Sequence, residues 1–192
     1  MADIYCFEPD PDTFASLASR YSAERRVKPV NAAVAATAGT ADFHLCTESA
    51  GSSLYPRNRS GRRYYYSQFV MRDSITVTTL TLDRFCREHG IEHLNLLKLD
   101  LQGGEHAALS GATALLRAQA IDVVVSEFFI VPHYENAPLL DSIWSLLRGH
   151  GYDMYDLQIV RYGSNGQARW GDAIFVSSRH RERYLDALPP EP

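Results

Sequence analysis

The feature that most restricts the fold is a dense apolar segment, Leu94 to Leu101, which carries Lys98 and Asp100 near its end. Near-continuous hydrophobicity over so short a length is typical of a central parallel strand that is buried on both faces. Parallel strands need crossover connections, and apolar patterns of strand and helix type do alternate along this chain. The sequence therefore predicts an α/β fold with a doubly wound, mostly parallel sheet and right-handed crossovers.

Other segments carry the apolar patterns of strands and helices. Strands are expected at residues 4–7, 27–34, 41–45, 75–79, 94–101, 121–125, 152–157 and 173–176, and helices at 14–21, 82–86, 104–116 and 139–147. A turn-rich Gly163-Ser164-Asn165-Gly166 joins the last two strands and predicts an antiparallel hairpin at a sheet edge. Periodicity is lost from Thr47 to Ser74, which predicts a long loop.

Size and composition restrict the class of protein. With 192 residues, the chain suits one domain, which we place at residues 1–188, followed by a disordered proline-rich tail at 189–192. A net charge of −4 offers no general attraction to phosphate polymers, so no nucleic acid partner is expected. No apolar run approaches the roughly 20 residues that span a bilayer, and the first residues lack a signal-peptide pattern. We therefore expect a cytoplasmic protein with no membrane partner.

Metal and disulfide chemistry find little support in the sequence. The three cysteines, Cys6, Cys46 and Cys86, are widely spaced and form no CxxC pair, so each is expected to be a small buried hydrophobic residue. The histidines show no metal-ligand spacing either. We predict that no metal is required.

Two acidic segments follow predicted strands, where open parallel sheets bind their ligands. Glu8 comes directly after the strand at 4–7, and a carboxylate in this position can accept hydrogen bonds from both hydroxyls of a ribose. Alternatively, Glu8 or Asp10 only caps the next helix, with Asp10 the better cap. The second segment contains Lys98, Asp100 and Glu105, which either form a structural ion pair and helix start or belong to an active site.

Five motifs together resemble a known family. In chain order they are Phe7-Glu8-Pro9-Asp10, Val30-Asn31-Ala32-Ala33, Gly51-Ser52-Ser53-Leu54, Val77-Thr78-Thr79-Leu80 and Leu97-Lys98-Leu99-Asp100, the last with Gly103 and Glu105. Their order and spacing resemble the FkbM family of methyltransferases, from about Asp3 to Ser177. The resemblance implies a Rossmann-like sheet, S-adenosylmethionine as the cofactor, and methylation of a small-molecule hydroxyl on a sugar, polyketide or related metabolite.

The resemblance also implies roles for individual residues. Glu8 would hold the ribose hydroxyls of the cofactor, Asn31, Ala32 and Ala33 would border its adenine, and Asp100 would lie near its sulfonium end. Lys98, Glu105, Ser52 and Ser53 are assigned to the acceptor substrate. For the catalytic step, the candidates are Asp100, His106, Glu127 and His133, because a hydroxyl acceptor benefits from a general base. Arg57, Arg59, Arg62 and Arg63, beside Tyr64-Tyr65-Tyr66, either contact the acceptor or form a solvated basic loop.

The sequence departs from the family pattern in two places. It begins after the first strand and glycine-rich loop of the family, so the strands that end at Glu8 and Asp100 are expected to face a gap. Either the sequence is an incomplete record or the fold has adapted. Gln102 stands where an acid is more common, and Gly104 where alanine is usual, which weakens any case for a carboxylate-bound metal.

Three functions are therefore compared. The leading hypothesis is an S-adenosylmethionine-dependent O-methyltransferase. The alternative is a noncatalytic binding or assembly module of methyltransferase type that has lost its glycine loop. A nicotinamide-dependent dehydrogenase is a third possibility, and only Glu8 supports it.

Overall fold

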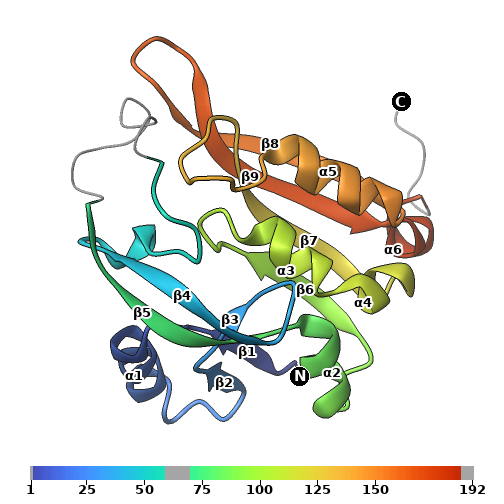
Figure 1. Cartoon of the computed structure of the whole chain (residues 1–192). Helices are drawn as coiled ribbons and strands as arrows, with labels where there is room; N and C mark the ends of the chain where they lie inside the picture. The colour runs from blue at the N-terminus through green and yellow to red at the C-terminus, as the bar shows by residue number, and fades with distance from the viewer. Residues whose placement is uncertain (1, 59–69, 187–192) are drawn as a thin grey trace.

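The computed structural model describes residues 2–58 and 70–186. Arg59, Arg62, Arg63, Tyr64-Tyr65-Tyr66 and the tail at 189–192 lie outside these residues. In the described ranges the fold is a mixed α/β arrangement whose strands form three hydrogen-bonded sheets (Figure 1). None of the helices in these ranges is long and apolar enough to cross a membrane.

The largest sheet has four strands in the order β6-β7-β9-β8. These are β6 (Leu94–Leu99), β7 (Ile121–Phe129), β8 (Tyr152–Tyr162) and β9 (Ala168–Ser177). β6 and β7 are parallel, whereas β9 is antiparallel to both β7 and β8. The predicted antiparallel hairpin at a sheet edge is thus confirmed. The predicted mostly parallel sheet is not observed, because half of the pairings in the described part of the chain are antiparallel.

Three helices pack beside the four-stranded sheet: α3 (Glu105–Ser110), α4 (Thr113–Arg117) and α5 (Leu140–Gly149) (Figure 1). A single helix was expected where α3 and α4 lie. The helix is interrupted at Gly111, where the chain passes close to another backbone segment. A Cβ atom on Gly111 would lie 2.2 Å from the carbonyl oxygen of Ala35. Only glycine permits this approach.

The remaining strands form two smaller sheets. β1 (Ile4–Phe7) pairs in parallel with β2 (Val27–Val30), and β5 (Met71–Leu80) lies between β3 (Ala33–Val34) and β4 (Gly39–Cys46). The expected strand at 27–34 is therefore two strands in different sheets. The expected loop is also shorter than predicted, because β5 begins at Met71 and pairs with Cys46 on β4. The other elements are α1 (Pro11–Arg20), η1 (Ser49–Gly51), α2 (Leu82–Glu88), α6 (Ser178–His180) and η3 (Arg181–Leu185).

β6 is not the strand buried on both faces that its composition predicted. Leu96 is 59% exposed and Lys98 is exposed, whereas Leu99 is buried. β6 forms one edge of its sheet, and β1 forms an edge of its own sheet, with Ile4 50% exposed. No hydrogen bonds pair β1 with β6 in the described residues, so the strands that end at Glu8 and Asp100 belong to different sheets.

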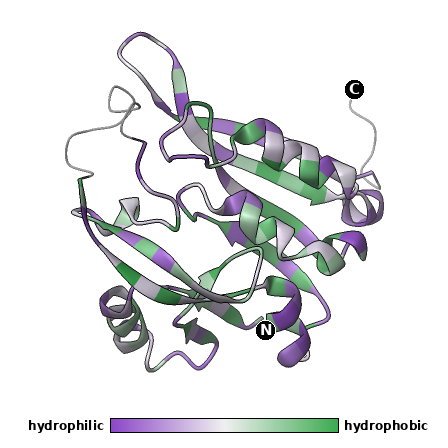
Figure 2. Ribbon diagram, viewed as in Figure 1, coloured by the Kyte–Doolittle hydropathy of each residue, from purple (hydrophilic) through white to green (hydrophobic). Residues whose placement is uncertain are grey.

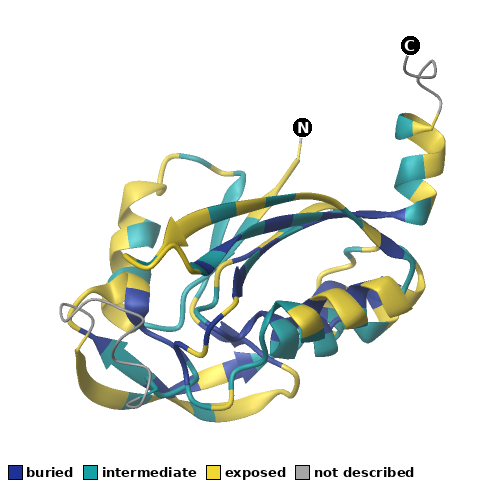
Figure 3. Ribbon diagram, turned by 90° about the horizontal axis from the view of Figure 1, so that it is seen from above, coloured by how far each residue is buried: buried dark blue, intermediate teal, exposed yellow. Residues whose placement is uncertain are grey.

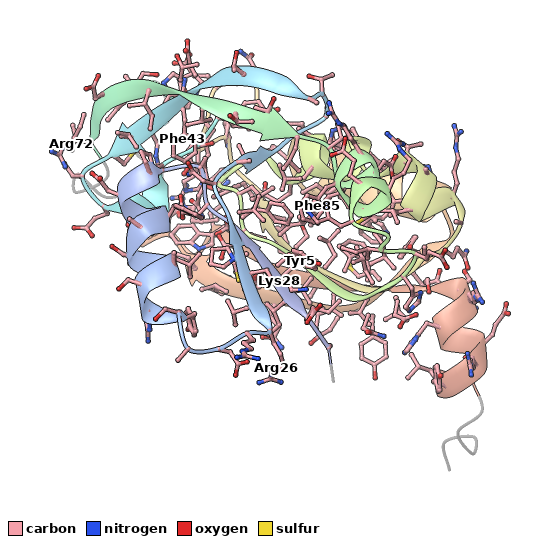
Figure 4. The ribbon with its side chains drawn as sticks, turned by 90° about the horizontal axis from the view of Figure 1, so that it is seen from below. Tyr5, Arg26, Lys28, Phe43, Arg72 and Phe85 are labelled. Carbon is pink, nitrogen blue, oxygen red and sulfur yellow. The ribbon has the colours of Figure 1, made fainter. Side chains whose placement is uncertain are left out.

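The core lies between the helices and the strands. Figure 2 shows hydrophobic residues along the strands, and Figure 3 shows buried residues where strands and helices face each other. Phe85 on α2 joins β1 to this core, because its ring lies 5.2 Å from that of Tyr5 and 4.9 Å from that of Phe7. On the other side of Tyr5, the ammonium group of Lys28 lies 5.1 Å from the ring centre (Figure 4). Of the cysteines, Cys46 and Cys86 are buried and Cys6 is half-buried, all three as free thiols.

Candidate active site

A cavity of about 520 Å³ opens beyond the carboxyl ends of β1, β6 and β7. Ligands of open α/β sheets bind at such a position. Its lining comes from segments far apart in the sequence. It includes Glu8, Ala32, Ala33, Ser52, Arg57, Asp100, Gln102, Glu127, Phe129, His133 and Trp170. The cavity has two ends of different chemistry.

At one end, the turn after β1 presents Glu8. Asp10 is the N-cap of α1, since its carboxylate accepts hydrogen bonds from the backbone N–H of Asp12 at 3.1 Å and from the hydroxyl of Thr13 at 2.9 Å. The cap that sequence reasoning assigned to Asp10 is confirmed, and Glu8 is left for another role. Its Oε1 accepts from the Asp10 N–H at 2.9 Å, and Oε2 has no hydrogen-bond partner among the described residues. Burial raises the pKa of Glu8.

The segment after β2 supports this turn and completes the wall beside it. Ala32 and Ala33 line the cavity and are almost fully buried, and their small side chains leave room for a ligand. Asn31 was expected at the same wall but is exposed and does not line the cavity. Its side-chain amide instead donates to the carbonyl oxygens of Glu8 at 2.9 Å and Pro9 at 3.2 Å. Asn31 therefore holds the turn that carries Glu8.

At the other end, Asp100 follows β6 with both carboxylate oxygens engaged. Oδ2 accepts from the ammonium group of Lys98 at 3.0 Å, and Oδ1 accepts from the side-chain amide of Gln102 at 2.9 Å. The pairing of Lys98 with Asp100, one of the expected partners, is thus observed, but both side chains are about half exposed rather than buried. Lys98 does not line the cavity, so a direct contact with the acceptor is not supported.

Glu105 is 1% exposed and turned toward the backbone rather than the cavity. Its Oε1 accepts from the N–H groups of Leu101 at 2.7 Å and Gly103 at 3.3 Å. Burial, the largest cause, raises its pKa to about 7 although these bonds favour the charged form. Glu105 shapes the turn after β6, and the direct substrate contact assigned to it is not supported.

The two serines have different environments. Ser52 lines the cavity, and its hydroxyl oxygen accepts from the Cys46 N–H at 3.1 Å. Ser53 is fully buried and does not line the cavity: its hydroxyl donates to the carbonyl oxygen of Gln102 at 2.8 Å and accepts from the Tyr55 N–H at 2.9 Å. Of the two serines expected to contact the substrate, only Ser52 therefore lines the cavity, and Ser53 instead fixes the turn after β6.

Glu127, at the end of β7, is the second acid at this end of the cavity. Burial, the largest cause, and the nearby charges of Asp100, Glu105 and Asp172 together raise its pKa to about 9, against a hydrogen bond from Gln102 that lowers it. Glu127 is therefore neutral at neutral pH. Its Oε2 accepts from the Gln102 amide at 2.9 Å. Glu127 does not pair with Lys98, whose ammonium group binds Asp100.

Aromatic side chains enclose the same end. His133 is 2% exposed and lies 5.3 Å from the ring of Trp170 and 4.8 Å from that of Phe129, and all three residues line the cavity. The guanidinium group of Arg57 lies 4.4 Å from the ring centre of Tyr134, a favourable cation–π distance. Arg57 also lines the cavity, and it is the one arginine of the predicted basic loop that lies within the described residues.

His106 was expected as a candidate base, but the structure places it on α3 outside the cavity lining. Burial lowers its pKa. A role in catalysis is therefore not supported, because a base must reach the proton that it removes. Within residues 2–58 and 70–186, no three histidine, cysteine, aspartate or glutamate side chains are arranged to hold a metal.

Sequence reasoning missed the central position of Gln102, which it treated only as a departure from the family pattern. The side chain of Gln102 contacts Asp100, Glu127 and Tyr134, and its carbonyl oxygen accepts from Ser53. A polar residue two positions after a strand-end acid was the only available signal. Its partners on β7 and in the loop after β7 are 25 and 32 residues away in the chain.

The fold and the cavity define an α/β protein with a ligand site at its strand ends. The chain belongs to the Methyltransferase FkbM domain family, whose family model matches residues 2–154. It is 28% identical over 155 residues to the 2-O-methyltransferase NoeI of Sinorhizobium fredii (strain NBRC 101917 / NGR234), covering 76% of this chain and 61% of that protein's length. The crystal structure of Methyltransferase FkbM from Methylobacillus flagellatus KT is similar in fold, with a TM-score of 0.50 and 14% sequence identity over 91% of this chain and 36% of that one.

Proposed function

We propose that the protein is an S-adenosylmethionine-dependent methyltransferase of Rossmann-like fold that methylates a hydroxyl group of a small molecule. Family membership supports the reaction class. The relative named as a 2-O-methyltransferase supports oxygen as the methylated atom. The observation that carries the proposal is the cavity at the strand ends, with an unpaired carboxylate oxygen at one end and two acids of different charge at the other.

The residues at the Glu8 end fit the nucleoside part of S-adenosylmethionine. Glu8 has one oxygen held by the backbone and the other available to accept hydrogen bonds from ribose hydroxyls. Ala32 and Ala33 form an apolar wall without bulk, which suits a flat base. When bound, the cofactor supplies a methyl group on a positively charged sulfur. Asp100, at the other end of the cavity, would attract this charge.

The other end fits a hydroxyl acceptor. Methyl transfer to oxygen requires the hydroxyl proton to leave, and an ionised carboxylate within hydrogen-bonding distance can accept it. Asp100 is the acid for this role, because Lys98 and Gln102 donate to it. Neutral Glu127 can donate a hydrogen bond to a second oxygen of the acceptor. Phe129, Trp170 and His133 exclude water from this end.

Isothermal titration calorimetry of the 192-residue chain with S-adenosylmethionine and S-adenosylhomocysteine tests the proposal. We expect each ligand to bind saturably with one-to-one stoichiometry, and the two ligands to compete for the same site. The absence of binding at millimolar ligand would contradict the proposal and favour the noncatalytic module considered above. Preferential binding of NAD would instead favour a dehydrogenase.

A further inference from the structure

The side-chain amide of Gln102 joins two acids that come from different strands. Its single nitrogen, Nε2, lies 2.9 Å from Oδ1 of Asp100 and 2.9 Å from Oε2 of Glu127. An NH₂ group has two hydrogens, so it donates one to each acid. All three side chains line the cavity. The two acids are thus held by one rigid planar group.

The other atoms of Gln102 are fixed as well. Its Oε1 lies 2.9 Å from the hydroxyl of Tyr134, which is 1% exposed and has a pKa well above the ordinary value because of burial, so it is a neutral donor. The hydroxyl has one hydrogen and a second possible acceptor, the carbonyl oxygen of Gly51 at 3.2 Å, and it donates to Oε1 at the shorter distance. Because Oε1 faces a donor, Nε2 must face the acids. Tyr134 therefore determines which way round the amide lies.

The backbone at Gln102 has an unfavourable conformation, which the surrounding contacts must stabilise. Its φ is 55°, a left-handed conformation that residues other than glycine seldom adopt. Such conformations persist where surrounding contacts fix them, and they cluster at functional sites. Here Ser53 fixes the carbonyl oxygen of Gln102, and Gly103 continues the turn with φ of 97°.

We propose that Gln102 is a positioning residue that holds Asp100 and Glu127 side by side at the acceptor end of the cavity, one as a hydrogen-bond acceptor and the other as a donor. This inference rests on the proposed function. The amide donates to Oε2 of Glu127, so the acid proton of Glu127 is left on Oε1, which has no hydrogen-bond partner among the described residues. The acceptor then meets a carboxylate for its reacting hydroxyl and an acid O–H for a second oxygen.

The charged groups around the pair oppose a second negative charge. Three acids raise the pKa of Glu127 by their charge: Asp100 after β6, Glu105 on α3 and Asp172 on β9, its register partner. Lys98 binds the other carboxylate oxygen of Asp100. Arg57 faces Tyr134. Without the Gln102 amide, Asp100 and Glu127 would lose the one donor that they share.

The first experiment needs neither cofactor nor acceptor. The side-chain carboxyl groups are labelled with ¹³C and titrated by NMR in the wild type and in Gln102→Met, which keeps the side-chain length and removes the amide. The midpoint of Glu127 is expected to rise in the variant, because the hydrogen bond from Gln102 favours the ionised form. An unchanged midpoint in a folded variant would overturn the proposal.

The second experiment separates positioning from a structural role. In methyl transfer, Gln102→Met is expected to lower kcat about 10- to 100-fold, with an altered pH profile and little change in the KM for S-adenosylmethionine. Tyr134→Phe is expected to lower kcat less, because the amide is kept but loses its orientation. Gln102→Asn tolerates the left-handed backbone but is one methylene shorter. Restored turnover in Gln102→Asn would show a merely structural role and overturn the proposal.

The outcomes also separate this inference from the proposed function. A wild-type chain that neither binds S-adenosylmethionine nor transfers methyl groups contradicts the proposed function. A wild type that does both, with a Gln102→Met variant of equal kcat and pH profile, contradicts only the role of Gln102.

Discussion

The two ends of the cavity are built in different ways. At the nucleoside end, the side chain of Glu8 is held by the N–H of Asp10 in its own turn, and its carbonyl oxygen is held by Asn31 after the neighbouring strand β2. At the acceptor end, Asp100, Gln102 and Glu127 meet across two strands and the turn after β6. The first end presents a single carboxylate on a turn, whereas the second is a hydrogen-bonded group of three side chains. The two ends should therefore respond differently to substitution.

The largest expected effect is at the acceptor end. Asp100→Asn should lower kcat by about 10²- to 10⁴-fold, because an amide cannot accept the hydroxyl proton. Its thermal stability should be nearly unchanged, since the side chain is about half exposed. Turnover and melting temperature would be measured together. Asp156→Asn, at an exposed acid of β8, is the matched control and should keep full turnover. Equal turnover in both variants would exclude Asp100 as the base.

At the nucleoside end, Glu8→Ala should weaken S-adenosylmethionine binding. The loss of hydrogen bonds to a charged group costs about 1.5–3 kcal/mol, or about 10- to 100-fold in Kd. Calorimetry would compare it with Asp12→Ala, which removes an exposed acid of the adjacent helix outside the cavity. If both variants bind as the wild type does, the ribose does not lie against Glu8.

The acids of the acceptor end should make stability depend on pH. The pKa of Glu127 is raised to about 9 in the folded protein, so the unfolded chain loses this proton first as the pH rises. Folding stability should therefore fall as the pH rises from about 5, with Glu105 and Glu127 both contributing up to about pH 7 and Glu127 alone up to about pH 9. Glu127→Gln should remove part of this fall and raise the melting temperature more at about pH 8.5 than at about pH 5.

Melting curves across this pH range provide the measurement, with Glu92→Gln at an exposed position as the control. The same pH dependence in Glu127→Gln as in the wild type would mean that Glu127 is already ionised at neutral pH.

A smaller effect is expected for Ser53, and it should show whether this residue supports the turn after β6 or contacts the ligand. Ser53→Ala leaves the carbonyl oxygen of Gln102 and the N–H of Tyr55 without their partner, which should cost about 1–3 kcal/mol of stability. The affinity for S-adenosylmethionine should change little, because Ser53 does not line the cavity. Thermal unfolding and calorimetry test both statements, with Ser74→Ala on β5 as the control. A large loss of affinity at unchanged stability would place Ser53 in the binding site after all.

The difference between the two ends also explains what the sequence could predict. The strand at Ile4–Phe7, the cap at Asp10 and the carboxylate of Glu8 follow from neighbouring residues, and the structure agrees with each of them. The predicted burial of β6 on both faces was wrong. The apolar composition of a strand indicates that it favours burial, but not whether another element lies beside it to bury it. Leu96 is apolar yet 59% exposed at the sheet edge.

The role of Gln102 could not be predicted for a similar reason. Its contacts depend on where β7 and the loop after it place Glu127 and Tyr134, and no local pattern encodes those distances. The same holds for Ser53 and Glu105. Their residue types suggested ligand contacts, but their positions in the fold direct them to the backbone.

The central claim is that the nucleoside of S-adenosylmethionine lies at the Glu8 end and the acceptor at the Asp100 end. A crystal structure of the chain with S-adenosylhomocysteine tests it most directly. The ribose hydroxyls should lie within hydrogen-bonding distance of the free oxygen of Glu8, with the sulfur toward Asp100. A ribose bound away from Glu8, or a ligand that fills the pocket beside Trp170 and His133, would contradict the account.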